Sequence, residues 1–331
     1  MDRSAYLVRP FVDSDFEAEV RIDREIDPEH AFTVEEVRHW NEILNLEPDH
    51  ANVKFAVEER QTGEAVGYGS LAQPSFNYDP RWFWIWVAVG PAHRRRGIGT
   101  ELFARLEAEA LARNGLGFWG STREQDADGV RFLERRGFRV LRKIWQSRLD
   151  LSELDFSAVP DRSIPLAREG FRLSTLAEEG STSPEIRQRL YRLSQISAAD
   201  IPRLGTFHPV SFDEFVALDL DAPGSMPEGL FLACKGTEVV GMSSLERALA
   251  RPDTVQVGYT GTHPEFRGRG IGTELKRRAA LFARQSGFRF LLTGNDSLNR
   301  AILKINHRFG FRPDTVWIQG DKSLAPSSGV R

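Results

Sequence analysis

Residues 262–273 read Thr262-His263-Pro264-Glu265-Phe266-Arg267-Gly268-Arg269-Gly270-Ile271-Gly272-Thr273. A strand-like run precedes this stretch, and an amphipathic helical pattern follows it. A basic, glycine-containing loop between a strand and a helix lets backbone N–H groups and the positive end of the helix dipole receive a phosphate. The stretch therefore predicts an anion-binding loop at the start of a helix.

A second version of the stretch lies in the first half of the chain: Val89-Gly90-Pro91-Ala92-His93-Arg94-Arg95-Arg96-Gly97-Ile98-Gly99-Thr100. Arg94 and Arg267 are 173 residues apart, and the Gly-Phe pairs that begin at Gly137 and Gly310 have the same spacing. A repeat of this length indicates a duplicated domain rather than a solenoid. For either loop alone, the alternative interpretation is an ordinary basic turn between a strand and a helix.

The composition is that of a globular protein. Its 331 residues suffice for two domains, each with its own core. The net charge of −3 gives no general attraction to nucleic acid or membranes, and no run of about 18 apolar residues is present. The single cysteine, Cys234, excludes an internal disulfide framework, and the seven histidines show no metal-ligand spacing. We expect a cytoplasmic monomer or homodimer with no metal and no nucleic-acid or membrane partner.

Each half has the same order of predicted elements around its loop. The run at 82–89 is strongly β-prone and apolar on both faces, which is typical of a buried central strand, and 255–262 is the corresponding strand of the second half. Residues 152–168 carry prolines at 160 and 165 and are predicted to be a linker. This gives an N-terminal domain at 1–151 and a C-terminal domain at 169–331.

The two loops carry a family resemblance. Arg94-x-x-Gly97-x-Gly99 and Arg267-x-x-Gly270-x-Gly272 resemble the (Gln/Arg)-x-x-Gly-x-(Gly/Ala) pyrophosphate loop of the GNAT N-acetyltransferase superfamily. The proline before each loop and the closing Gly-Phe pair fit the same order, so the resemblance covers nearly the whole chain. It implies an α/β fold of two tandem GNAT domains, each with a mixed sheet and one splayed parallel pair of strands, in an arrangement similar to that of mycothiol synthase.

The resemblance also implies acetyl-CoA as the cofactor, with the pyrophosphate on the loop and the pantetheine arm along the preceding strand. Carried over by position, the expected pantetheine contacts are Val87 and Val89 in the first half, and Thr260 and Thr262 in the second. The expected pyrophosphate contacts are Arg94, Arg95, Arg96, Gly97, Ile98, Gly99 and Thr100 in the first half, and Arg267, Gly268, Arg269, Gly270, Ile271, Gly272 and Thr273 in the second.

The catalytic positions depart from the family pattern. The tyrosine that serves as general acid in many members falls at Leu133 and Asn306, and a glutamate that some members use as base falls at Phe83 and Gln256. Leucine has no exchangeable side-chain proton, and an asparagine amide forms hydrogen bonds but does not titrate. Asn306 and Gln256 are therefore the candidate catalytic residues, as groups that position a water molecule or the thiol.

Polar residues favour the second half as the catalytic one. Asn295, Asn299 and Asn306 occur around its last predicted helix, where the first half has Thr122, Asp126 and Leu133. Asn299 and Asn306 are seven residues apart and share a helix face, so Asn299 is expected to border the cofactor. For Asn295 and Asp296, the alternative to a role in the site is helix capping.

We expect direct transfer of an acetyl group from acetyl-CoA to a primary amine of a small molecule or peptide. The alternative is a CoA-binding sensor or scaffold whose catalysis has decayed, because the tyrosine and glutamate positions are changed. Aminoacyl transfer in peptide crosslinking also uses paired GNAT-like domains, but those domains generally lack two intact loops.

Overall fold

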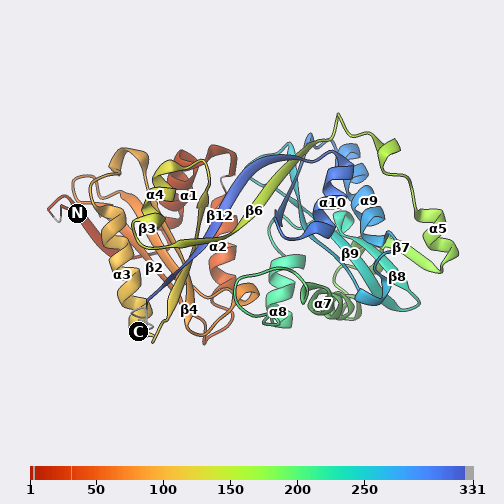
Figure 1. Ribbon diagram of the computed structural model, residues 1–331, viewed down its shortest axis with the longest axis horizontal. Helices are drawn as coiled ribbons and strands as arrows, with labels where there is room; N and C mark the ends of the chain where they lie inside the picture. The colour runs from red at the N-terminus through yellow and green to blue at the C-terminus, as the bar shows by residue number, and fades with distance from the viewer. Residues whose placement is uncertain (3, 31, 325–331) are drawn as a thin grey trace, which may run out of the picture. The chain divides into compact units, whose positions relative to one another are not determined.

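A computed structural model describes residues 1–2, 4–30 and 32–324. The chain forms two compact units, which we describe separately (Figure 1). Unit 1 comprises Met1–Arg142, Leu204–His208 and Ile318–Arg331, and unit 2 comprises Lys143–Arg203 and Pro209–Trp317. The units differ from the sequence repeats in their last strands, as described below.

Unit 1 has a sheet of strand order β1-β2-β3-β4-β5, to which part of β12 is added. β4 and β5 are parallel, and the pairs from β1 to β4 are antiparallel. The elements are β1 (Tyr6–Pro10), α1 (Asp15–Ile26), η1 (Pro28–His30), α2 (Val34–Ile43), β2 (Asn52–Glu59), β3 (Ala65–Ala72), η2 (Ser75–Asn77), β4 (Trp82–Val89), η3 (Pro91–His93), α3 (Ile98–Ala112), β5 (Gly117–Arg123) and α4 (Ala127–Glu134).

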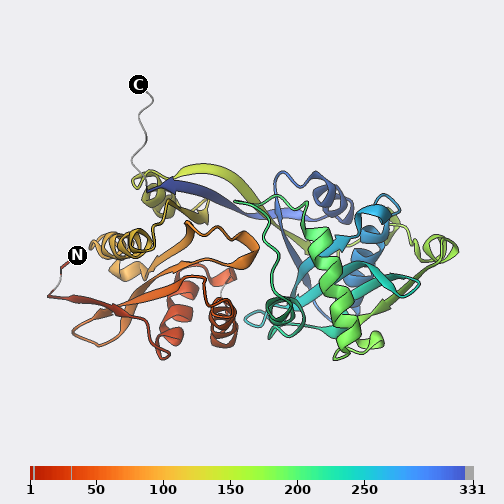
Figure 2. The same ribbon diagram turned by 90° about the horizontal axis from the view of Figure 1, so that it is seen from below.

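Helices cover both faces of this sheet, because neighbouring residues of a strand point to opposite sides. The Tyr68 hydroxyl donates to Asp23 of α1 over 2.7 Å. A Cβ on the adjacent Gly69 would instead lie 3.2 Å from Leu102 of α3. The sheet therefore lies between α1 and α3, as the turned view shows (Figure 2).

Unit 2 repeats the plan with strand order β6-β11-β10-β9-β8-β7, in which β10 and β11 are parallel. Its elements are β6 (Arg139–Asp150), η4 (Phe156–Ala158), α5 (Ser163–Arg168), β7 (Phe171–Thr175), α6 (Leu176–Glu179), α7 (Pro184–Ala198), α8 (Phe212–Phe215), a π-helical turn η5 (Val216–Leu220), η6 (Pro227–Gly229), β8 (Phe231–Lys235), β9 (Glu238–Arg247), β10 (Thr254–Thr262), η7 (Pro264–Phe266), α9 (Ile271–Gln285), β11 (Phe290–Asp296), α10 (Arg300–Phe309) and β12 (Arg312–Ser323). The predicted linker thus contains the short helices η4 and α5.

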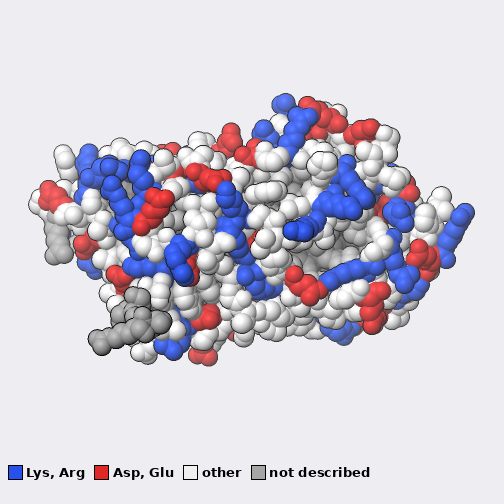
Figure 3. Space-filling view, viewed as in Figure 1, with Lys and Arg blue, Asp and Glu red and all other residues white. Residues whose placement is uncertain are grey.

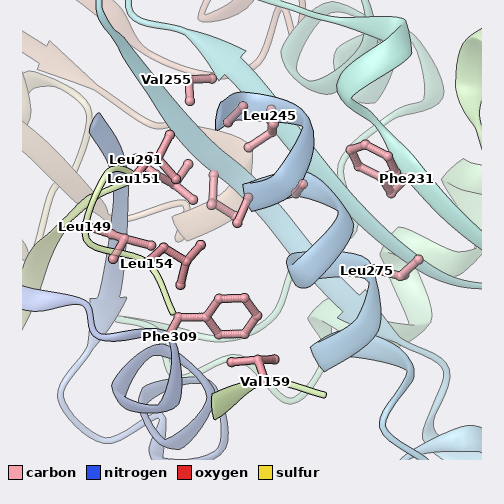
Figure 4. Close-up of a cluster of buried hydrophobic side chains, with 14 of the residues drawn as sticks. Leu149, Leu151, Leu154, Val159, Phe231, Leu245, Val255, Leu275, Leu291 and Phe309 are labelled. Carbon is pink, nitrogen blue, oxygen red and sulfur yellow. The ribbon is translucent and has the colours of Figure 1, made fainter. Parts of the chain in front are cut away.

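Each face of the unit 2 sheet is covered by its own hydrophobic cluster. Leu275 of α9, Leu245 of β9 and Leu291 of β11 belong to one cluster on one face of the sheet (Figure 4). Met242 of β9 packs with Leu190 of α7 on the other face. Odd-numbered residues near the end of β9 therefore face α9, and even-numbered residues face α7.

Strands β6 and β12 each run from one unit into the other. The second part of β6 pairs with β11 in unit 2, from Asp150 opposite Phe290 to Ile144 opposite Asp296. In return, the second part of β12 lies in unit 1, where the Ser121 hydroxyl donates to the Ile318 carbonyl over 3.1 Å. Each repeat therefore supplies the last strand of the other repeat's unit.

The parallel pair in each unit opens towards the loop. β10 and β11 pair at only three positions, from Thr254 to Gln256, and β4 and β5 pair at four, from Trp82 to Ile85. Beyond these positions the two strands separate. β10 also has a bulge against β9 between Val257 and Thr260, whereas β4 pairs with β3 without interruption.

Candidate active site

The loop of unit 2 has the backbone shape of an anion cradle. Gly268 and Gly270 have φ of 77° and 83°, the left-handed region that glycine adopts without strain. Gly270 is the N-cap of α9, so the first N–H groups of that helix point into the loop. A Cβ on Gly272 would lie 3.4 Å from the Thr262 hydroxyl and 3.9 Å from Thr260, so it would be in ordinary contact with β10 and would meet no clash.

Arginine side chains surround this loop. Arg267 Nε donates to the Thr262 carbonyl over 3.1 Å, and Arg269 pairs with Glu169 at 3.1 Å. A third arginine, Arg162, is packed against Gly270: a Cβ there would lie 2.5 Å from its Nε. That Nε is buried and makes no hydrogen bond within the part of the chain that the structure describes. A buried N–H without an acceptor beside a phosphate-type loop fits the pyrophosphate of CoA.

The loop of unit 1 has a similar backbone but is covered by protein. Gly97 has φ of 80° and caps α3, and Arg95 also lies in the left-handed region with φ of 65°. A Cβ on Gly99 would lie 2.9 Å from the Phe132 ring of α4, so an aromatic side chain lies against this glycine, which is not the case at Gly272. A Cβ on Gly97 would lie 2.5 Å from the Met1 backbone nitrogen.

The loop arginines of unit 1 are also engaged with protein groups. Arg95 pairs with Asp128 of α4 at 3.5 Å, and Arg94 lies 3.8 Å from the same carboxylate. Arg96 donates to the Tyr6 hydroxyl over 2.6 Å. Arg267 of unit 2 also pairs with Asp200, so the pairing of the arginines does not separate the two loops. The difference that favours unit 2 for a CoA pyrophosphate is the Phe132 ring at Gly99, which has no equivalent at Gly272.

The structure places the two candidate catalytic residues on different elements of unit 2. Gln256 is exposed on β10, opposite Glu246 of β9 and Leu292 of β11. Asn306 is buried on α10, where its amide donates to Asn295 Oδ1 of β11 over 2.6 Å. Asn299 is the N-cap of α10 and accepts from the Ile302 N–H over 3.4 Å. Asn306 and Asn295 are thus brought together, while the Asn299 side chain caps the helix.

The carboxylate of Glu246 lies beside the bulge of β10. This residue is not among those predicted from the sequence. Glu246 is opposite Gln256, and a Cβ on Gly258 would lie 1.8 Å from its Oε1. Glu246 therefore occupies the space of the missing Gly258 side chain. The nearby Ser244 hydroxyl accepts from the Tyr259 N–H over 2.8 Å and so holds the bulged backbone. The signal in the sequence was Gly258 itself, because an isolated glycine in a strand indicates a bulge or a close approach.

The charge of Glu246 is tuned by its surroundings. Burial, with a smaller contribution from Asp219 of η5, raises the pKa of Glu246 to about 7. Burial also raises the pKa of Asp219 to about 7. Asp219 lines a small cavity of about 10 Å³ together with Ser225 and Ser244. A carboxyl group that titrates near neutral pH is suited to general base catalysis.

The fold and this site define an acetyltransferase: the chain belongs to the acetyltransferase (GNAT) family, whose model matches residues 16–138 and 193–311. The predicted tandem GNAT fold is therefore confirmed, and acetyl-CoA is the acetyl donor of this family.

Its relatives include two mycothiol acetyltransferases. That of Nocardia farcinica is 28% identical over 281 residues, which cover 83% of this chain and 84% of the relative. That of Mycobacteroides abscessus is 27% identical over 230 residues, or 68% and 70% of the two chains.

Two solved structures share the fold. A tandem GNAT protein from the clavulanic acid biosynthesis pathway has a TM-score of 0.76 at 19% identity and covers 98% of this chain and 100% of its own. A GCN5-related N-acetyltransferase from Sphaerobacter thermophilus has a TM-score of 0.70 at 20% identity, with coverage of 98% and 97%.

Two further observations concern partners. Among the residues that the structure describes, no helix has the length and apolar character needed to cross a membrane. Lys and Arg are interspersed with Asp and Glu over the visible face, so that face carries no extended surface of one sign (Figure 3).

Proposed function

We propose that unit 2 transfers an acetyl group from acetyl-CoA directly to the primary amine of a small molecule or peptide. The observation that carries this proposal is the contrast between the two loops: a Cβ on Gly272 would meet only Thr262 and Thr260 of β10, at 3.4 and 3.9 Å, whereas a Cβ on Gly99 would lie 2.9 Å from the Phe132 ring. Acetyl-CoA supplies an activated thioester carbonyl. Unit 1 then serves mainly to support the fold.

In this proposal the residues of unit 2 divide the reaction between the two faces of the sheet. The loop and Arg162 bind the pyrophosphate, and the separated part of β10, with Thr260 and Thr262, holds the pantetheine arm. Glu246 is an even-numbered residue of β9 and therefore faces α7, where it receives a proton from the incoming ammonium group. Asn306 lies on α10, and its amide donates a hydrogen bond to the sulfur as the C–S bond breaks and the new C–N bond forms. The second proton that the nitrogen loses passes to the leaving thiolate.

A matched pair of substitutions tests which unit reacts. Gly272→Val places a branched side chain between the loop and Thr260 and Thr262 of β10, and we expect acetyl transfer to fall by about 100-fold, the scale of a misplaced substrate. Gly99→Val is the control in unit 1, where we expect less than about a twofold change in the activity of the folded fraction. Equal losses from both variants, or loss from Gly99→Val alone, would contradict the assignment.

The alternative is a CoA-binding sensor or scaffold without turnover. Release of free thiol from acetyl-CoA, measured over a library of small amines and peptides, separates the two functions. We expect amine-dependent release for the enzyme. CoA binding without release on any amine, at pH values above and below 7, would favour the sensor.

A further inference from the structure

A buried lysine lies next to Asn306. Lys276 of α9 has no solvent exposure, and its Nζ donates to Asn306 Oδ1. The same ammonium group lies 4.9 Å from the centre of the Phe311 ring. Burial lowers the pKa of Lys276 to about 7, and no carboxylate contributes to this shift. A buried amine without a counter-ion destabilises a fold, so its presence needs another reason.

In unit 1, apolar side chains occupy the positions that correspond to Lys276 and Asn306. At the repeat spacing, Lys276 corresponds to Phe103, Asn306 to Leu133 and Asn295 to Thr122. Phe103 is 5% exposed in the core and packs with Phe118 and Phe138. The polar group of three side chains therefore occurs only in the unit with the open loop, and packing alone does not require it.

The three side chains fix the orientation of one amide group. In its charged form a lysine side chain has only donors, so the atom of Asn306 that faces it is then the carbonyl oxygen. The Asn306 NH₂ group then faces β11, where one N–H is donated to Asn295 Oδ1 over 2.6 Å. Asn295 lies beyond Leu292, the last residue of β11 that pairs with β10, so this NH₂ group is held against the separated part of β11. A thiolate is an acceptor, so a fixed N–H matches the charge that develops on the leaving sulfur.

We propose that Lys276 is a positioning residue, which holds the Asn306 amide so that its N–H group meets the sulfur of CoA. This inference rests on the proposed function of unit 2. Lys276, on the helix that follows the loop, then takes part in the reaction through Asn306. Asn306, at the position of the family's tyrosine, donates a hydrogen bond to the thiolate.

A double-mutant cycle tests the inference. Lys276→Met keeps an unbranched chain of similar length and removes the donor. We expect kcat to fall by about tenfold, the value of one hydrogen bond to a charged group, with little change in KM for acetyl-CoA. We expect Tm to stay the same or rise, because no amine remains to be desolvated. Asn306→Ala and the double variant should have the same kcat, since Lys276 acts only through Asn306. Additive losses, or a fall in kcat explained by a lower Tm, would overturn the inference.

A second readout does not depend on the acceptor amine. CoA is bound to the intact protein at a fixed pH near the pKa of the free thiol, and the thiolate is measured by its ultraviolet absorbance. We expect a larger thiolate fraction on the wild-type protein than on Lys276→Met. Equal fractions, with CoA bound to both proteins, would overturn this inference alone. Failure of the wild-type protein to bind CoA would overturn the proposed function and this inference together.

Discussion

Glu246 and Asp219 bring two carboxyl groups that titrate near neutral pH to one face of unit 2. A general base must be deprotonated to act, so we expect kcat/KM to rise with pH and to level off above about pH 7, the pKa given by burial of Glu246. Glu246→Gln should remove this rise and lower kcat/KM at high pH by about 100-fold, within the usual range for a general base. The measurement is a pH profile of acetyl transfer.

The control for this prediction is Glu238→Gln on the same strand. Glu238 is exposed and lies 3.8 Å from Arg192, so its removal should leave the profile unchanged. A wild-type profile that is flat between pH 5 and 9, or the same profile in Glu246→Gln, would exclude Glu246 as the base.

Arg162 is a second residue whose role depends on its place in the fold. Its Nε is buried against Gly270 without a hydrogen bond in the described part of the chain. We expect Arg162→Met to raise the Kd for CoA by about tenfold, because a charge-assisted hydrogen bond to a phosphate is lost. Arg168→Met, an exposed position in the same helical segment, is the matched control in calorimetric titrations. Equal affinities for the two variants would show that Arg162 does not contact the cofactor.

At the scale of elements, the bulge in β10 is the main difference between the two parallel pairs. At the repeat spacing of 173 residues, Gln256 corresponds to Phe83. The strand register instead makes Gln256 correspond to Trp84. Gln256 is opposite Glu246 of β9, and Trp84 is opposite Ala72, the equivalent position of β3. The bulge adds one residue to β10. The sequence could not reveal this insertion, since it is compensated within a few residues and leaves the loops in phase.

The bulge also positions Glu246, and this gives a prediction for the element. Gly258→Ala places a Cβ 1.8 Å from Glu246 Oε1, so the carboxylate must move away. We expect kcat/KM to fall by about 100-fold with little change in CoA affinity, since a displacement of about 1 Å has such an effect on a catalytic group. Gly294→Ala on β11 is the control, because a Cβ there meets no atom within 4 Å. Comparable losses in the two variants would rule out a specific effect on Glu246.

At the scale of the whole molecule, the sequence predicts the duplication, both loops and the strand–loop–helix order around them. These features depend on local patterns that occur twice. The exchange of β6 and β12 is not predictable in the same way, because either unit could pair with its own last strand using the same residues. The Lys276–Asn306–Asn295 group could not be predicted from the sequence either, because its members lie on three different elements. A lysine on a helix is also expected to be exposed.

The contrast between the two units predicts how many CoA molecules the intact chain binds. In unit 1, Phe132 fills the space at Gly99, its ring stacks with Arg136 at 3.4 Å, and Arg136 also donates to the Thr100 hydroxyl over 3.0 Å. Admission of CoA there requires Phe132 to move, whereas a Cβ on Gly272 meets no atom closer than 3.4 Å and no side chain has to move. We therefore expect calorimetry to give one CoA per chain, with binding lost in Gly272→Val and kept in Gly99→Val. Two sites of similar affinity would contradict this, because the contacts of Phe132 would then have no energetic effect on binding.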